Sequence, residues 1–256
     1  MLDLKWLALQ LDDSLERLPE LAGRVMTAGD PRCASDALAR IGKQLFSRLD
    51  ASGQPLVIDD TATMDLPLLP RITSSLLMVP LVSDGQTLGL IYGGEKTNGT
   101  HISSVDSKLC AALAGSISIF LENLALYGDM QGMFLGTLHA RTSAIDAKDS
   151  YTRGHSERVA LMSRMLAEKA GLDEAACERV YIAGLVHDVG KIGVPEAVLC
   201  KPGRLTDDEF ELIKMHPEIG ARILSDIRQM QDLIPGVLYH HERWDGRGYP
   251  HNLAGE

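Results

Sequence analysis

The sequence predicts two domains, an α+β domain followed by an all-helical domain. The chain has 256 residues, 45% hydrophobic and 23% charged, so each half is long enough to bury its own core. Strand patterns occur only in the first half, mainly over residues 56–94. Beyond residue 160 the apolar pattern is helical, with breaks at glycine and proline. We therefore expect a sheet with flanking helices and then a helical bundle.

Three apolar runs predict strands over residues 56–58, 76–82 and 88–92. The last two flank Asp84-Gly85, which predicts a hairpin. Residues 4–11 fit a strand or a helix, and residues 15–26 have a helical pattern. In the second half, Asp173 and the capping-box sequence from Thr206 to Glu209 predict the starts of two helices.

A long helical pattern begins near Ser103 and continues to about residue 149. Within it we expect a connecting helix over residues 128–149. Apolar residues at Met130, Phe134, Leu138 and Ile145 form a narrow seam. This seam is compatible with a homodimer of parallel helices, and equally with packing inside one domain.

The charge and the cysteines restrict the class of protein. There are 25 basic and 35 acidic residues, and this net charge of −10 argues against binding to DNA or RNA polymers. The four cysteines lie far apart, without a CxxC pair, as expected in the reducing cytoplasm. The N-terminus lacks a signal-peptide pattern, and the apolar stretches 76–82 and 111–121 are shorter than the roughly 20 residues that span a bilayer. We expect a cytoplasmic protein without a membrane segment.

Candidate metal ligands gather in the second half. Five of the eight histidines fall between residues 155 and 241, and one of them adjoins an aspartate: His155, His187-Asp188, His216, His240 and His241. A single histidine is more often a structural or surface residue than a ligand. Imidazole and carboxylate groups on separate helices of one domain can, however, converge on divalent metal ions.

The doublet His187-Asp188 can supply one terminal and one bridging ligand to two metals about 3.5–4 Å apart, which activate a water held between them. Gly184 lies on the same helical face as His187 and leaves space beside it. Lys191 can offer its ammonium to a phosphate oxygen. Its alternative role is that of a solvated lysine at a helix end.

These residues resemble a known family. His187-Asp188 with Gly190-Lys191 resembles the HD superfamily of metal-dependent phosphohydrolases, and residues 240–250, which end in Gly248-Tyr249-Pro250, resemble its HD-GYP subgroup. Residues 149–159 and 216–220 match the same subgroup. The resemblance covers about residues 130–256 and implies an HD-GYP domain over 150–256.

The resemblance implies a phosphodiesterase that hydrolyses cyclic di-GMP, a bacterial second messenger, with two divalent metal ions, iron or manganese. It implies that His155, His187 and Asp188 hold one metal, and that Asp188, His216, His240 and His241 hold the other. Lys191 would face the scissile phosphate. Gly248, Tyr249 and Pro250 would contact the nucleotide, a plain surface turn being the alternative, and a protein partner could bind the same loop. Members with three metals have glutamate where this chain has Tyr151, so we expect two metals and a linear dinucleotide product.

Family members carry a further aspartate ligand and more helices beyond the position of Glu256. The HD-GYP domain is therefore expected to be incomplete at its C-terminus, with weak metal retention and poor hydrolysis if the chain is whole. Two alternatives follow: an inactive signalling or dimerisation module, and an HD phosphohydrolase acting on another nucleotide.

Residues 56–60, 78–81, 88–92 and 121–127 together resemble a GAF domain, a fold that senses small ligands and signals. The resemblance covers about residues 38–127. It implies a GAF-like regulatory domain over 1–127, with the family's opening strands hard to find, and with an unknown small ligand or none.

Overall fold

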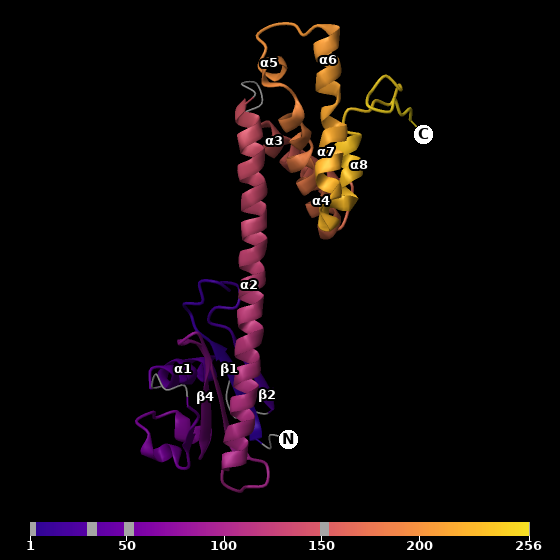
Figure 1. Cartoon of the computed structure of the whole chain (residues 1–256). Coiled ribbons are helices and arrows are strands. Elements are labelled where there is room, and N and C mark those ends of the chain that lie inside the picture. The colour runs from indigo at the N-terminus through magenta and orange to yellow at the C-terminus, as the bar shows by residue number, and fades with distance from the viewer. Residues whose placement is uncertain (1–3, 30–34, 49–53, 149–153, 256) are drawn as a thin grey trace. The chain divides into compact units, whose positions relative to one another are not determined.

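The computed structural model describes residues 4–29, 35–48, 54–148 and 154–255 (Figure 1). The chain divides into two compact units, Met1–Gln131 and Gly132–Glu256. Cys33 and the segment 149–153, which includes Tyr151, lie outside the described residues. Of the described cysteines, Cys110 and Cys177 are buried and Cys200 is exposed.

The first unit contains a five-stranded antiparallel sheet in the order β2-β1-β5-β4-β3. Its strands are β1 (Leu4–Leu11), β2 (Val25–Gly29), β3 (Leu56–Ile58), β4 (Leu76–Ser83) and β5 (Gln86–Lys96). The hairpin and the three predicted strands are confirmed, and residues 4–11 form a strand between β2 and the central strand β5.

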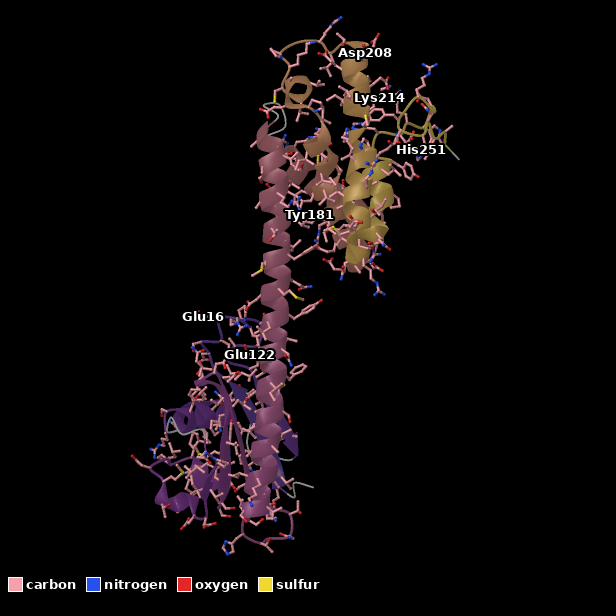
Figure 2. The ribbon with its side chains drawn as sticks, viewed as in Figure 1. Glu16, Glu122, Tyr181, Asp208, Lys214 and His251 are labelled. Atoms are coloured by element: carbon pink, nitrogen blue, oxygen red, sulfur yellow. The ribbon has the colours of Figure 1, made fainter. Side chains whose placement is uncertain are left out.

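The helical prediction for residues 15–26 is wrong. This segment forms successive turns before β2, with Leu18 N donating to Leu15 O and Leu21 N to Leu18 O. The turns place these three leucines against one core, so the three-residue spacing is satisfied without a helix. Arg17 in the same segment donates to Glu122 at 2.7 Å and to Asp129 at 2.8 Å, which ties it to helix α2 (Ser104–Lys148). Glu122 is labelled on this helix in Figure 2.

Helices cover both faces of the sheet, which confirms the α+β class. Leu76 and Met78 of β4 pack with Leu38 of helix α1 (Ser35–Phe46), and the 3-10 helices η1 (Thr61–Thr63) and η2 (Leu69–Arg71) border this core. The alternate residues of β4, Leu77 and Val79, point to the other face and pack against the first part of α2 (Figure 1).

By length and composition α2 could cross a membrane, so the expectation that every apolar stretch is too short was wrong for this helix. Core helices meet the same criteria. Four of its residues in the first unit, Cys110, Ala114, Leu121 and Ala125, are buried in the core beneath the sheet. Of the most apolar 18-residue stretch of α2, 28% is buried, so packing under the sheet accounts for part of its apolar character.

A capping box fixes the start of α2. Ser103 donates to Asp106 Oδ2 through both its backbone N and its Oγ, each at 2.7 Å, and Asp106 N donates back to Ser103 Oγ at 3.3 Å. Lys96 Nζ lies 3.0 Å from the same carboxylate. The hydrogen bonds from Ser103 and the Lys96 charge outweigh burial and lower the pKa of Asp106 to about 2.

We expect Asp106→Asn to lower the free energy of unfolding of the first unit by about 1–2 kcal/mol at pH 7. Because the pKa of Asp106 is below its unfolded value, its stabilisation is complete above pH 4 and is lost as the pH falls through about 2. Urea unfolding followed by Trp6 fluorescence, in a Trp244→Phe background, measures the difference. The exposed Asp65→Asn is the control, and equal stability of the Asp106 variant and the parent at pH 7 would contradict the prediction.

The second unit is all-helical, as predicted. Its helices are α3 (His155–Lys169), α4 (Glu174–Val186), α5 (Glu196–Leu199), α6 (Asp207–Lys214), α7 (His216–Ser225) and α8 (Ile234–Leu238), with the 3-10 helices η3 (Val189–Gly193) and η4 (Arg228–Leu233). The predicted caps are present: Asp173 accepts from Ala176 N at 2.7 Å, and Thr206 and Glu209 form the capping box.

The apolar seam predicted on α2 is divided. Ile145 is buried in the core of the second unit, with Leu138 packed against that core. Met130 and Phe134 are exposed. Packing within one domain therefore explains half of the seam, and the exposed half stays available for a dimer.

Candidate metal centre

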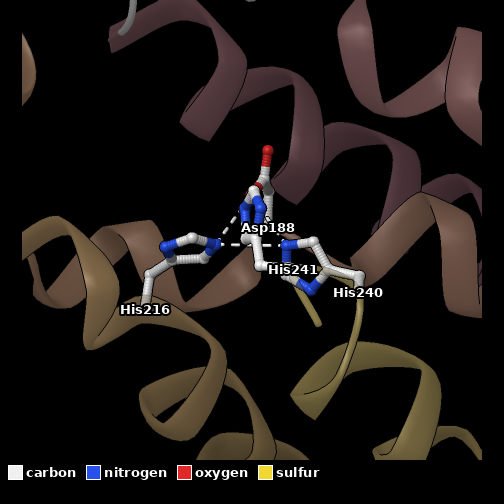
Figure 3. Close-up of side chains that lie close together, drawn as sticks. All are labelled: Asp188, His216, His240 and His241. Atoms are coloured by element: carbon white, nitrogen blue, oxygen red, sulfur yellow. Dashed lines mark hydrogen bonds and ion pairs between the residues drawn. The ribbon is translucent and has the colours of Figure 1, made fainter. Parts of the chain in front are cut away.

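The six predicted ligands all lie at helix ends. His155 and His216 are the first residues of α3 and α7. His187 caps the C-terminus of α4 and Asp188 follows it, while His240 and His241 come shortly after α8. Figure 3 shows four of these side chains, from three separate segments, pointing toward one another.

Asp188 is the centre of this arrangement and is only 4% exposed. Its Oδ1 lies 3.2 Å from His216 Nε2 and 3.8 Å from His240 Nε2. Its Oδ2 lies 3.2 Å from His187 Nε2, 3.7 Å from His155 Nε2 and 2.8 Å from Lys191 Nζ. The two carboxylate oxygens thus face different sets of side chains.

The side chains form two groups whose ligand atoms lie within 4.8 Å of one another. One group is His155, His187 and Asp188, and the other is Asp188, His216, His240 and His241. These are the two ligand sets that the HD-GYP resemblance implied, with Asp188 shared between them. The sharing fits a carboxylate that bridges two cations.

Three histidines are oriented in the same way. His187, His216 and His240 each place Nδ1 within 2.6–2.7 Å of the backbone carbonyl three residues earlier. A carbonyl oxygen only accepts, so each Nδ1 carries a proton, and the lone pair of the neutral ring is on Nε2. His216 Nε2 and His240 Nε2 face each other at 3.2 Å. Two lone pairs this close, beside a carboxylate, fit a divalent cation.

The electrostatics differ among the ligands: burial acts to lower the pKa of His187, but the hydrogen bond and the charge of Asp188 raise it overall. Burial is the main reason that the pKa of His240 falls to about 3 and that of His241 to about 4, so both rings are neutral. Burial raises the pKa of Asp188, but its close contacts with the His187 and His216 rings and the charge of Lys191 lower it overall to well below the usual range. Asp188 is therefore ionised.

Two glycines let the helices carrying these ligands approach closely. A Cβ at Gly184 would lie 2.8 Å from Ala160 Cα of α3, and one at Gly190 would lie 1.9 Å from His216 O. The expectation that Gly184 leaves space beside His187 was wrong, because α3 fills that space. The Gly184 carbonyl instead orients the His187 ring.

Lys191 and Tyr249 lie beside the cluster. Lys191 Nζ is paired with Asp188, so the predicted solvated alternative does not apply; its side chain is only 15% exposed. The Tyr249 ring stacks on His241 with centroids 4.5 Å apart, and burial raises its pKa to about 12. Gly248 lies so close to the Glu242 and Arg243 backbone that a Cβ would clash. The loop that carries Gly248 and Tyr249 therefore packs directly against the histidine cluster.

A cavity of about 880 Å³ opens beside His240 and His241. Besides Gly248, Tyr249 and Pro250, its walls include side chains that the sequence analysis did not single out, namely Phe210, Lys214, Arg243 and Arg247. Arg247 could have been predicted from the sequence as a substrate contact, since it lies between Gly246 and Gly248 in the motif of residues 240–250. Phe210 and Lys214, on α6, carry no comparable signal.

A helical domain whose helix ends place imidazoles around one shared carboxylate has a ligand set that suits divalent metal ions. Residues 141–256 match the family model described as HD domain, and the second unit is an HD domain. This confirms the HD resemblance of the sequence motifs.

A cyclic di-GMP phosphodiesterase of Pseudomonas aeruginosa is 46% identical over 113 residues, 44% of this chain and 27% of the relative. The 3'3'-cGAMP-specific phosphodiesterase 2 of Vibrio cholerae is 35% identical over 158 residues, 61% of this chain and 30% of the relative. The chain thus spans about a third or less of these relatives' length. A solved GAF domain/HD domain protein from Geobacter sulfurreducens aligns with 17% identity and a TM-score of 0.39, over 48% of this chain and 83% of that one.

Proposed function

We propose that the protein is a metal-dependent phosphodiesterase that hydrolyses cyclic di-GMP to the linear dinucleotide in the cytoplasm. The observation that carries the proposal is the convergence of His155, His187, His216 and His240 on the two oxygens of one buried aspartate, next to a cavity lined by cations and aromatic rings. The two relatives named above are phosphodiesterases of cyclic dinucleotides, which supports the substrate class.

We assign residues 1–127 to a GAF-like regulatory domain, 128–149 to a connecting helix and 150–256 to the HD-GYP domain. Two divalent ions, iron or manganese, are the proposed cofactors, one held by each ligand group. Imidazole with carboxylate suits both metals. Bound cations would supply Lewis-acid activation of the phosphodiester and of water.

The chain's own residues supply positioning and charge. Hydrolysis adds water across one P–O bond and opens the ring, with the proton going to the leaving sugar oxygen. Lys191 would turn from Asp188 to a phosphate oxygen and offset the charge that builds there. Tyr249, protonated because of its raised pKa, would donate a hydrogen bond to the nucleotide.

The cavity is lined by charges of both signs, Lys214, Arg243 and Arg247 together with Glu211, Glu218 and Glu242, so a dianionic substrate needs a cation that no carboxylate neutralises. Arg243 is held by Asp245, at 3.0 and 2.8 Å, and Lys214 pairs with Glu211. For Arg247, by contrast, we find no ion pair within the described part of the chain. Its guanidinium, with Lys191, would give the local positive field that the net charge of −10 lacks.

The test is incubation of the manganese- or iron-loaded protein with cyclic di-GMP and separation of the products by chromatography. We expect the linear dinucleotide. Parallel incubations with 3'3'-cGAMP and with nucleoside triphosphates distinguish the two alternative substrates. Turnover of triphosphates alone would replace the proposal with a different HD phosphohydrolase, and no turnover of any nucleotide by metal-loaded protein would contradict it.

We expect Tyr249→Ala to raise KM for cyclic di-GMP about 10-fold, corresponding to about 1.4 kcal/mol, with the metal content unchanged. The ring stacks on His241 and lines the cavity but lies outside both ligand groups. Steady-state kinetics with metal analysis measure both quantities, and Leu161→Ala, at an exposed position on α3, is the control. An unchanged KM would remove Tyr249 from the substrate site.

We propose a homodimer through α2. Its exposed apolar residues in the first unit support this: Ile119, Phe120, Tyr127 and Met130. Light scattering over a concentration series should give a dimer, and Phe120→Glu with Met130→Glu should shift it to monomer. A monomer at every concentration would contradict the dimer.

We also propose that a protein partner binds the loop of residues 240–250, which ends in Gly248-Tyr249-Pro250. The side chain of Trp244 in this loop is 81% exposed, which supports a partner there.

A further inference from the structure

Helix α3, which begins with His155, lacks a cap of its own. The residue before it, Gly154, has φ +65°, a conformation that favours glycine, and makes no side-chain cap hydrogen bond. The first backbone N–H groups of any helix have no partner within the helix and need acceptors from elsewhere. At α3 one such acceptor comes from another helix.

Asp146, near the end of α2, supplies it. Ser156 N donates to Asp146 Oδ2 at 3.2 Å, and Ser156 Oγ donates to Asp146 Oδ1 at 2.8 Å. Asp146 is 4% exposed and Ser156 is 2% exposed. A carboxylate at a helix N-terminus is also favoured by the helix dipole, so this buried pair holds the first turn of α3 firmly.

That turn places His155. His187, His216 and His240 are each oriented by a bond from Nδ1 to a backbone carbonyl. No such bond to His155 is found among the described residues, and its side chain is 38% exposed. Its position 3.7 Å from Asp188 Oδ2 therefore depends on the backbone of α3. Asp146 holds this backbone at the adjacent residue, Ser156.

We propose that Asp146 is a positioning residue for the metal centre: through Ser156 it fixes the first turn of α3 and so holds His155 toward Asp188. The inference rests on the metal-binding part of the proposed function. It makes the end of α2 the element that sets the geometry of the group formed by His155, His187 and Asp188. Because α2 is one helix from Ser104 to Lys148, a shift at its end would reach a metal ligand directly.

The test compares Asp146→Ala and Ser156→Ala with Thr142→Val in the full chain. Thr142 is a matched control because it lies one turn earlier on α2 and is 5% exposed. Among the described residues, its Oγ1 donates to Leu138 O and His139 O of the same helix, at 3.1 Å each. Manganese affinity is measured by titration, and amide hydrogen exchange over residues 155–159 is measured without metal.

We expect Asp146→Ala to weaken manganese binding about 10-fold, the usual effect of losing a residue that orients a ligand. Exchange in the first turn of α3 should become faster, whereas Thr142→Val should change neither quantity. Ser156→Ala keeps the bond from the backbone N of residue 156 to Asp146 and should give a smaller change in the same direction. Ser156→Thr keeps a hydroxyl as well and should bind manganese as the parent does.

Unchanged affinity and unchanged exchange in Asp146→Ala would overturn the proposal. If that variant does not fold, Ser156→Ala decides, since it removes one hydrogen bond, and its equality with the parent in both measurements would overturn the proposal equally. If the parent binds no manganese, the proposed function fails, and the exchange experiment alone decides whether Asp146 holds α3.

Discussion

Replacing Asp188 by asparagine lowers kcat/KM for cyclic di-GMP by more than about 1,000-fold, corresponding to about 4 kcal/mol of transition-state free energy. Asp188 belongs to both ligand groups, and its two oxygens face different histidines. A neutral amide of the same shape keeps the packing but removes the charge and one of the two oxygens. We therefore expect both metals to be weakened together, which metal analysis of the purified variant checks.

The control is Asp208→Asn, because Asp208 is exposed on α6 (Figure 2). Circular dichroism has to show that Asp188→Asn is folded, since breaking a buried ion pair costs about 3–5 kcal/mol. A folded Asp188→Asn that keeps the parent's metal content and activity would refute the role of Asp188 as the shared ligand.

Lys191→Met is expected to lower kcat about 100-fold, the usual effect of losing one group that stabilises transition-state charge. Metal content should stay near that of the parent. Lys191 contacts the metal ligand Asp188, but its protonated ammonium has no lone pair and so cannot itself bind a metal ion. Single-turnover kinetics on metal-loaded protein separates this loss from an effect on binding.

The matched control is Lys201→Met. Lys201 also pairs with a carboxylate, with its Nζ 2.6 Å from Glu209 Oε2, but Glu209 is not a metal ligand. An unchanged kcat in Lys191→Met would remove Lys191 from the reaction. A fall in metal content as large as the fall in kcat would mean that Lys191 acts only by holding Asp188 in place.

The fold was predictable where local sequence determines it. The Asp84-Gly85 turn, the alternating run of β4 and the capping boxes at Ser103 and Thr206 act over a few residues, and the structure contains them all. Residues 15–26 were mispredicted because a three-residue apolar spacing suits both a helix and a series of turns over a sheet. Only the sheet beneath them decides between the two.

The site was predictable in its residues but not in its geometry. The motifs named all six ligand candidates, and the structure brings them into two groups around Asp188. The orienting bonds to Gly184 O, Ile213 O and Val237 O come from the backbone and leave no sequence signal. The link from Asp146 to Ser156 joins residues ten apart on different helices, so no helical spacing shows it.

The most direct measurement is anomalous X-ray scattering from crystals of the protein grown with manganese. Two peaks are expected, one between Asp188, His155 and His187, and one between Asp188, His216, His240 and His241. Crystals with manganese bound elsewhere, or with no peak beside either oxygen of Asp188, would contradict the central claim that this aspartate joins two metal sites.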